Sequence, residues 1–196
     1  MTYVWYREVT SADSISQGDI LEDLPVLTFR DEVTEAADLE AMKRGLQNAA
    51  GIRAVRAVVM TQACDIEQGK VRYIHLCPAF TLAEFKNDWK RTLEAQNQNP
   101  TDKAWRNTCE QIRTGRVWNY TMLNERIADA DGLSQEFLII DFHEVFSLPL
   151  GFLRSWVGVR GARRLQLCPP YREHLSQSFA RYFMRVGLPV DLRPPV

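Results

Sequence analysis

The sequence lacks the long apolar runs that mark membrane-spanning helices. No stretch approaches the roughly 20 consecutive apolar residues that a bilayer span requires. Residues 1–8 also lack an apolar core with a basic flank, so we expect no secretory signal. These absences predict a soluble, cytoplasmic protein that makes no membrane contact.

Cysteine is sparse as well, with four residues in a chain of 196. Cys64, Cys77, Cys109 and Cys168 are widely spaced, which is not typical of a small disulfide framework. Without an export signal, reduced thiols in a cytosol are the favoured interpretation.

Neither sign of charge is in excess. The chain has 24 Lys and Arg against 25 Asp and Glu, a net charge of −1. No global positive field would recruit nucleic acid, so RNA binding would need a local patch. The 45% hydrophobic and 25% charged content is typical of globular proteins. The length suits one domain over residues 1–196.

Hydrophobic periodicity predicts the elements of an α+β fold. Gly-, Pro- and Asp-containing turns separate the strand-like segments. The expected strands are residues 3–6, 20–29, 54–61, 71–79, 118–123, 137–142 and 144–150, with 54–61 and 71–79 forming a hairpin. Helix signals cover two insertions at about 34–50 and 82–116, the second broken near 97–100, and a C-terminal segment at 171–186.

The C-terminal segment has the clearest helical pattern. Leu175, Phe179, Tyr182, Phe183 and Val186 recur at spacings that place them on one face. Two prolines precede this helix, and a glycine and a proline follow it. The pattern predicts an amphipathic helix that packs on the sheet.

Five pieces of sequence occur in a distinctive order. They are residues 18–20 (Gly-Asp-Ile), 57–61 (Ala-Val-Val-Met-Thr), 76–78 (Leu-Cys-Pro), 140–143 (Ile-Asp-Phe-His) and the helix at 171–186. This order resembles the PemK/MazF toxin family. The resemblance implies a small SH3-like β-barrel with a C-terminal helix, here carrying two helical insertions, and it implies a homodimer.

The same resemblance implies residues for cleavage of single-stranded RNA. The family's arginine falls at Val55 in this chain, and the neighbouring Arg53 and Arg56 are not aligned with it. The family's hydroxyl residue falls at Phe80 or Thr81, of which only Thr81 has a hydroxyl. The resemblance therefore supports the fold more than the endoribonuclease activity.

A thiol site is a further alternative. Cys64 follows a buried strand, and His75 on the partner strand could act as its base. The structural alternative is a small buried cysteine beside a turn that Asp65 caps. Zinc ligands usually come in close pairs, and Cys64, His75, Cys77 and Cys168 contain only one, so we expect neither metal nor cofactor.

Asp141 and His143 lie two residues apart on an expected strand and share a face. They could form an acid–base pair. The alternative is that they belong to the solvated face of a strand whose other face carries Leu138, Ile140 and Phe142.

One segment is densely basic and contains two glycines, which favours an exposed hairpin or loop. It comprises Arg154, Trp156, Arg160, Arg163 and Arg164. Arginines with an interleaved aromatic suit phosphates and stacked bases, or an acidic protein partner through bidentate pairs. A solvated loop is the third interpretation.

The insertions carry Trp89, Trp105 and Trp118, and any that stay exposed are candidate interface anchors. The leading hypothesis is a non-catalytic PemK/MazF-like binding module that acts through a protein partner in a bacterial toxin–antitoxin or phage-defence complex. The alternatives are an endoribonuclease toxin and a cysteine-dependent enzyme.

Overall fold

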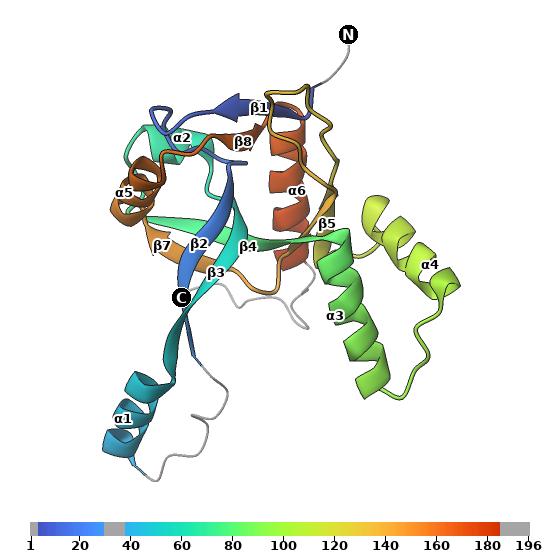
Figure 1. Ribbon diagram of the computed structural model, residues 1–196. Coiled ribbons are helices and arrows are strands. Elements are labelled where there is room, and N and C mark those ends of the chain that lie inside the picture. Colours follow the sequence, from blue (N-terminus) through green and yellow to red (C-terminus); the bar gives the residue numbers. More distant parts are fainter. Residues whose placement is uncertain (1–3, 30–37, 185–196) are drawn as a thin grey trace, which may run out of the picture.

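A computed structural model of the protein describes residues 4–29 and 38–184 (Figure 1). Its strands are β1 (Tyr6–Val9), β2 (Ile20–Phe29), β3 (Ala50–Val59), β4 (Tyr73–Thr81), β5 (Tyr120–Leu123), β6 (Leu138–Asp141), β7 (Phe146–Pro149) and β8 (Arg164–Leu167). Its helices are α1 (Leu39–Ala49), α2 (Ala63–Glu67), α3 (Leu82–Ala95), α4 (Asp102–Arg113), α5 (Leu150–Arg160) and α6 (Tyr171–Phe183). The predicted α+β class is confirmed.

Most strands join one antiparallel sheet in the order β2-β3-β4-β6-β5. The predicted hairpin of β3 and β4 is confirmed, and β2 with its Pro25 lies at an edge. The first half of β4 pairs with β7 and the last three residues pair with β6. The sheet thus divides along β4 and stays open, so the predicted closed barrel is wrong.

A separate two-stranded ribbon, β1 with β8, lies across the end of the sheet. It joins the start of β2 through the bridge between Asp19 and Gln166 and a hydrogen bond from Leu167 N to Gly18 O. Gly18 has a φ of +82°, and an added Cβ would lie 2.8 Å from the Leu167 side chain. Only glycine fits this approach, which fixes where β2 begins.

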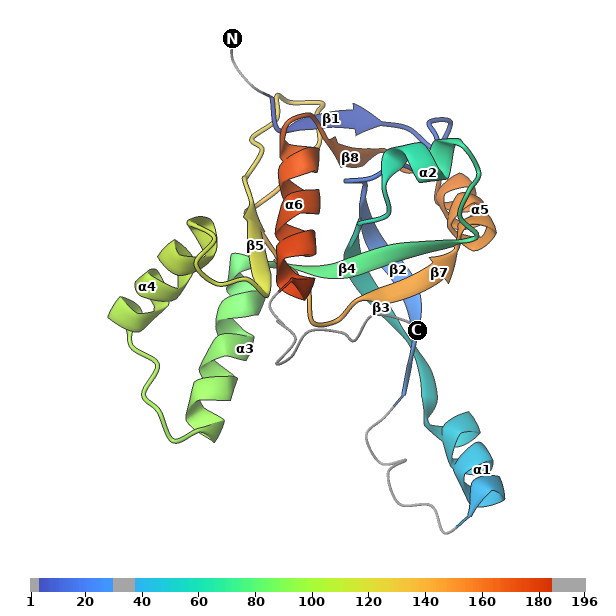
Figure 2. The same cartoon turned by 180° about the vertical axis from the view of Figure 1, so that it is seen from behind.

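The core lies on both faces of the sheet. Alternation along β3 sends Val58 into one buried cluster and Ala57 and Val59 into the other. Helix α6 covers the first face, where the Phe179 ring meets Phe142 edge-on at 5.5 Å. Helix α5 covers the second (Figure 2). The amphipathic C-terminal helix is confirmed through Phe183, and Val186 lies outside the described residues.

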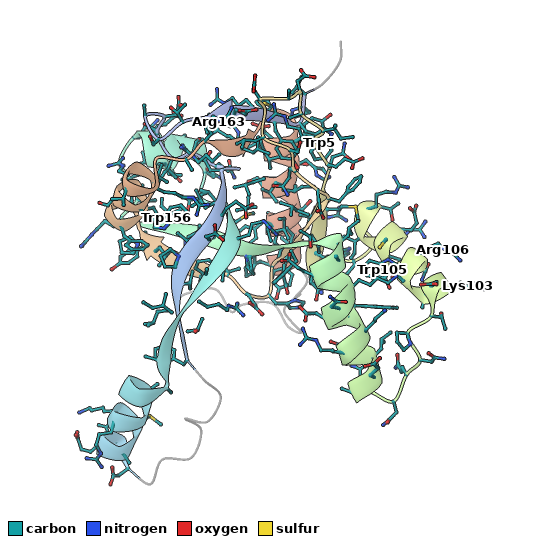
Figure 3. All side chains as sticks on the ribbon, in the orientation of Figure 1. Trp5, Lys103, Trp105, Arg106, Trp156 and Arg163 are labelled. Atoms are coloured by element: carbon teal, nitrogen blue, oxygen red, sulfur yellow. The ribbon has the colours of Figure 1, made fainter. Side chains whose placement is uncertain are left out.

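The insertion at 82–116 forms a pair of helices, α3 and α4, and the predicted break near 97–100 is confirmed. Phe85 and Ile112 from these helices form a third buried cluster with Ile139 of β6. Trp105 lies between the two helices (Figure 3), and its ring centroid is 5.3 Å from that of Trp89. This insertion completes the core at one edge of the sheet.

Two local expectations need correction. The first helical insertion begins at Leu39 with Asp38 as its N-cap, and residues 34–37 of the predicted helix lie outside the described residues. A strand is expected over 3–6, but β1 begins at Tyr6 and runs to Val9. The segment 62–70 that joins β3 to β4 contains the short helix α2. No helix in the described ranges is long and apolar enough for a bilayer.

Candidate functional site

The ends of β2 and β3 extend beyond the body of the protein and carry α1 at their tip (Figures 1 and 2). We call residues 25–29 and 38–54 the arm. The cross-strand pairs on one face of the arm are Pro25 with Ala54, Leu27 with Ile52 and Phe29 with Ala50. Cross-strand partners and alternate residues share a face, so one face of the arm is wholly apolar.

This apolar face is uncovered in the structure. Leu27 and Phe29 are 60% and 53% exposed, and Ile52 is 78% exposed. Ala50 and Ala54 beside them are exposed too. Scattered apolar residues are common on protein surfaces, but a contiguous apolar patch marks an interaction site.

Helix α1 extends the apolar surface of the arm. Leu39, Met42 and Leu46 recur at i, i+3 and i+7, and all three are exposed. The three buried clusters of the described residues include no residue of α1. A helix of eleven residues is marginal in water without packing. Ala49 at its end is buried, but the helix joins none of the buried clusters that the described residues form.

Among the described residues of the arm, basic side chains outnumber acidic ones. Glu40 and Lys43 form an ion pair at 2.7 Å. Arg44 and Arg53 are exposed, and neither forms an ion pair with the described carboxylates. A partner of the arm would meet an apolar face, and at its margin two guanidinium groups that pair with no described carboxylate.

The three residues implied for RNA cleavage lie close together. Arg56 Nε donates to Glu22 at 2.7 Å and Arg56 Nη1 donates to Glu84 at 3.1 Å. Glu84 also accepts from the backbone N–H of Thr81 at 2.7 Å. Arg53 lines the same cavity of about 260 Å³.

These contacts give the residues structural roles. Thr81 is the N-cap of α3 and forms a capping box with Glu84. Desolvation opposes ionisation of Glu84, but the hydrogen bonds from Thr81 and the nearby Arg56 lower the pKa of this carboxyl below its ordinary value. Two carboxylates already compensate the Arg56 guanidinium, which leaves it less able to bind a phosphate.

Cys64 and His75, the two residues of the predicted thiol site, form hydrogen bonds with different residues. The Cys64 thiol is exposed and lies within hydrogen-bonding distance of Gln62 and Asp65. His75 Nδ1 contacts Ser147 Oγ at 2.8 Å. The expectation that Cys64 is buried is wrong. The buried thiol is Cys77, and desolvation raises its pKa to about 12. Within the described ranges, no group of three side chains could hold a metal ion.

The basic segment is neither a hairpin nor a loop. Helix α5 contains Arg154, Trp156 and Arg160, and β8 begins at Arg164. Arg160 donates to Asp23 at 2.9 Å and lies 5.3 Å from the centroid of the Trp156 ring. These side chains hold α5 against the start of β2.

The last two arginines of the segment also have internal partners. Arg163, at the end of the fold where β1 lies (Figure 3), donates to Glu8 at 2.7 Å. Arg164 is buried, donates to the fully buried Asp19 at 2.8 Å and donates to three backbone carbonyls. Of the five predicted binding residues, only Arg154 is an exposed arginine without an ion pair among the described residues.

Asp141 and His143 are brought together as predicted. His143 Nδ1 lies 2.8 Å from Asp141 Oδ1, and the His143 ring meets Tyr120 edge-on. Burial, with Asp141 and Glu144 nearby, raises the pKa of Tyr120 to about 12. The pair lies at the edge of the sheet beside α3, where Asp141, Glu144 and Asp88 line one open cavity.

The arm is the candidate site that the sequence did not identify. Its signal was present as alternation of apolar residues at 25, 27 and 29 and again at 50, 52 and 54. Such alternation normally marks a strand with one buried face. The sequence pattern alone could not show that none of the described helices and strands covers that face.

Comparison with known protein families, curated proteins and solved structures found no match for this chain. The PemK/MazF resemblance therefore stays a prediction from the sequence, as does the homodimer that it implies.

Proposed function

We propose that the protein is a non-catalytic binding module that acts through a protein partner seated on the arm. The observation that carries this proposal is the uncovered apolar face formed by Leu27, Phe29 and Ile52 together with α1. The arm takes five residues from each strand, 25–29 and 50–54, and includes the eleven residues of α1. The arm thus offers about 20 residues, which is typical of one side of a standard interface.

The partner that fits this surface is an apolar protein segment with acidic residues at its margins. Apolar side chains would bury Leu27, Phe29 and Ile52 from water, each contributing about 25 cal/mol per Å² of apolar area. Carboxylates would meet Arg44 and Arg53, which have no ion pair among the described residues. A second copy of this chain would bring the same two arginines, while the described carboxylates of the arm are the helix cap Asp38 and Glu40, which pairs with Lys43, so it fits less well.

The edge position of β2 suits the same partner. An edge strand presents unpaired backbone groups to which another chain can add as a strand. Pro25 removes one such donor near the body, so added pairing would lie toward the tip. The arm could then hold an extended segment by backbone hydrogen bonds and by its apolar face.

The catalytic hypotheses draw less support from the geometry. Glu22 and Glu84 engage Arg56, Thr81 caps a helix, and Cys64 and His75 have different partners. Membership of a bacterial toxin–antitoxin or phage-defence complex, and the finer PemK/MazF assignment, form part of the proposal and rest on the sequence resemblance.

Site-directed photo-crosslinking tests the proposal in the native host. We place a photoreactive phenylalanine analogue at position 52, where the side chain is exposed at the centre of the arm. Val159 on α5 is the matched control position, because it is 90% exposed and lies away from the arm. We expect position 52, and not position 159, to join a different protein through a peptide rich in apolar and acidic residues.

Two outcomes overturn the proposal. One is an adduct of position 52 with the chain itself, together with dimerisation in sedimentation that Ile52→Asp abolishes. The other is an adduct no stronger than that from position 159. Growth arrest on expression that Arg56→Ala relieves, with cleavage of single-stranded RNA, would favour the ribonuclease alternative instead.

A further inference from the structure

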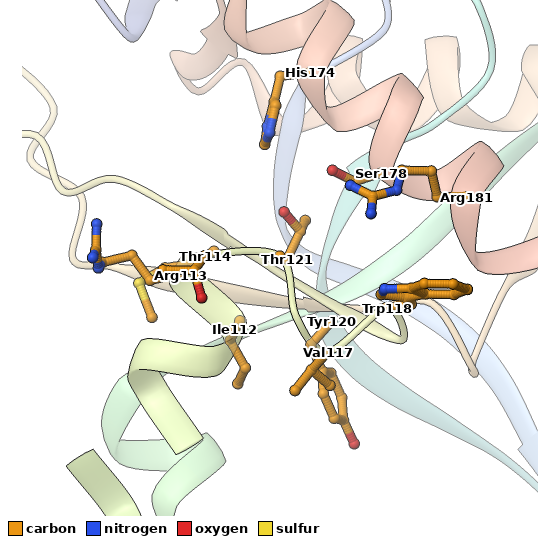
Figure 4. A pocket seen from close by; sticks show the side chains of 12 residues that line it. Ile112, Arg113, Thr114, Val117, Trp118, Tyr120, Thr121, His174, Ser178 and Arg181 are labelled. Carbon is orange, nitrogen blue, oxygen red and sulfur yellow. The ribbon is translucent and has the colours of Figure 1, made fainter. Parts of the chain in front are cut away.

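A second, independent feature is a cavity of about 140 Å³ between the end of α4, β5 and α6. Three residues of α6, His174, Ser178 and Arg181, occur at i, i+4 and i+7 and line one side (Figure 4). Trp118 and Thr121, just before and within β5, line the opposite side. The remaining wall is largely apolar and includes Ile112, Val117 and Met122.

The charge of this cavity sets it apart from its neighbours. Arg113, His174 and Arg181 line it, and no carboxylate of the described residues does. The cavity at Arg56 contains Glu22, Asp23 and Glu84, and the one beside α3 contains three acidic residues. In a chain of net charge −1, a cavity lined by two arginines and a histidine, and by no described carboxylate, favours an anionic ligand.

Arg181 is the cation best placed for such a ligand. Arg113 is already paired with Glu110 at 2.7 Å. Arg181 forms no ion pair with any described carboxylate, and its guanidinium lies 5.7 Å from the centroid of the Trp118 ring. The hydroxyl-bearing side chains of Ser178 and Thr121 line the same cavity (Figure 4). A guanidinium beside two hydroxyls matches the donors that bind a phosphate group.

Trp118 adds an aromatic surface at the rim. Its side chain is 42% exposed, while Trp89 and Trp105 of the same insertion are half-buried. Aromatic rings stack on nucleobases without strong preference for the base, and a neighbouring arginine strengthens the stack. The cavity is large enough for a phosphate, and the ring beside it could hold the base.

We propose that this cavity binds a mononucleotide. Arg181, Ser178 and Thr121 hold its phosphate, and Trp118 stacks on its base. The site is built from the helical insertion and α6, and it shares no residue with the arm. Nucleotide binding and partner binding can therefore be tested separately.

Calorimetry of the full-length protein with AMP, adenosine and inorganic phosphate tests the proposal. We expect AMP to bind at least about tenfold more tightly than adenosine or phosphate, since charged hydrogen bonds and stacking each contribute. AMP should quench tryptophan fluorescence in the wild type and not in Trp118→Phe. Affinity should fall as salt rises.

Matched variants assign the effect to the site. Arg181→Gln should weaken AMP binding at least about tenfold. Arg72→Gln, which removes the same charge from an exposed position just before β4, should not. Both variants should keep the wild-type circular dichroism and thermal midpoint.

Three results overturn the proposal. They are equal binding of AMP and adenosine, equal losses in Arg181→Gln and Arg72→Gln, or tighter binding of a 5′-phosphorylated oligoadenylate than of AMP by about tenfold or more. The last result would assign the cavity to single-stranded nucleic acid. None of these results affects crosslinking at position 52, so failure here is distinct from failure of the proposed function.

Discussion

Of the two helical insertions of this protein, one packs into a buried cluster and the other does not. Helices α3 and α4 bury Phe85 and Ile112 against the edge of the sheet and place Trp105 between them. Helix α1 lies at the tip of the arm and leaves Leu39, Met42 and Leu46 exposed. Both segments are amphipathic in sequence, so amphipathicity does not decide which one joins the core.

The difference lies in what covers the apolar face of each insertion. An insertion whose apolar face is covered contributes to stability, and its loss should unfold the protein. An insertion whose apolar face is uncovered should contribute little to stability, and its apolar face suits the partner proposed above. Two comparisons between these insertions test this distinction, and a third concerns α3 alone.

The largest difference in the free energy of unfolding should come from replacing one apolar residue on each insertion by alanine. Phe85 is buried and meets the Tyr120 ring edge-on at 4.9 Å. Phe85→Ala should lower the free energy of unfolding by about 3–5 kcal/mol. Leu46→Ala on α1 should change it by no more than about 0.5 kcal/mol. Urea denaturation measures both, and equal losses would contradict the distinction.

Replacing the N-cap residue of one helix in each insertion should give a smaller difference in stability. Thr81 caps α3 and Asp38 caps α1, each by accepting a backbone hydrogen bond. Thr81→Ala should lower the global free energy of unfolding by about 1 kcal/mol. Asp38→Ala should increase amide hydrogen exchange in α1 alone and leave the global value unchanged. A global loss in Asp38→Ala would show that α1 is part of the cooperative core.

The smallest effect concerns pH. The pKa of Glu84 lies below its ordinary value in the folded protein, so the folded state binds fewer protons than the unfolded state. Its contribution to stability is therefore present above about pH 4.3 and is lost as pH falls through the folded pKa. Glu84→Gln should make the acid-side loss of stability shallower.

The control for the pH experiment is Glu94→Gln on the same helix. Glu94 is exposed and forms no ion pair with the described residues. This variant should follow the wild-type curve of denaturation midpoint against pH. Identical curves for both variants would show that the Glu84 network does not contribute.

Much of the secondary structure could be predicted because it depends on local patterns. The apolar run of β3, the break between α3 and α4 and the apolar face of α6 each follow from spacing along the chain. The basic segment was mistaken for a loop because its two glycines outweighed a weak helical pattern. Gly158 lies within α5, where packing of Leu153 and Val157 against the sheet sustains the helix.

The candidate sites depend on contacts between residues far apart in the sequence, so local patterns could not predict them. The sequence established an α+β protein with a central apolar hairpin and an amphipathic C-terminal helix, because periodicity is a property of neighbouring residues. It could not show that Arg164 meets Asp19, 145 residues away, or that Arg181 reaches Trp118. Only the tertiary structure decided which arginines are satisfied internally and which apolar faces stay uncovered. The physical reason is that burial and charge pairing depend on what each side chain meets in space.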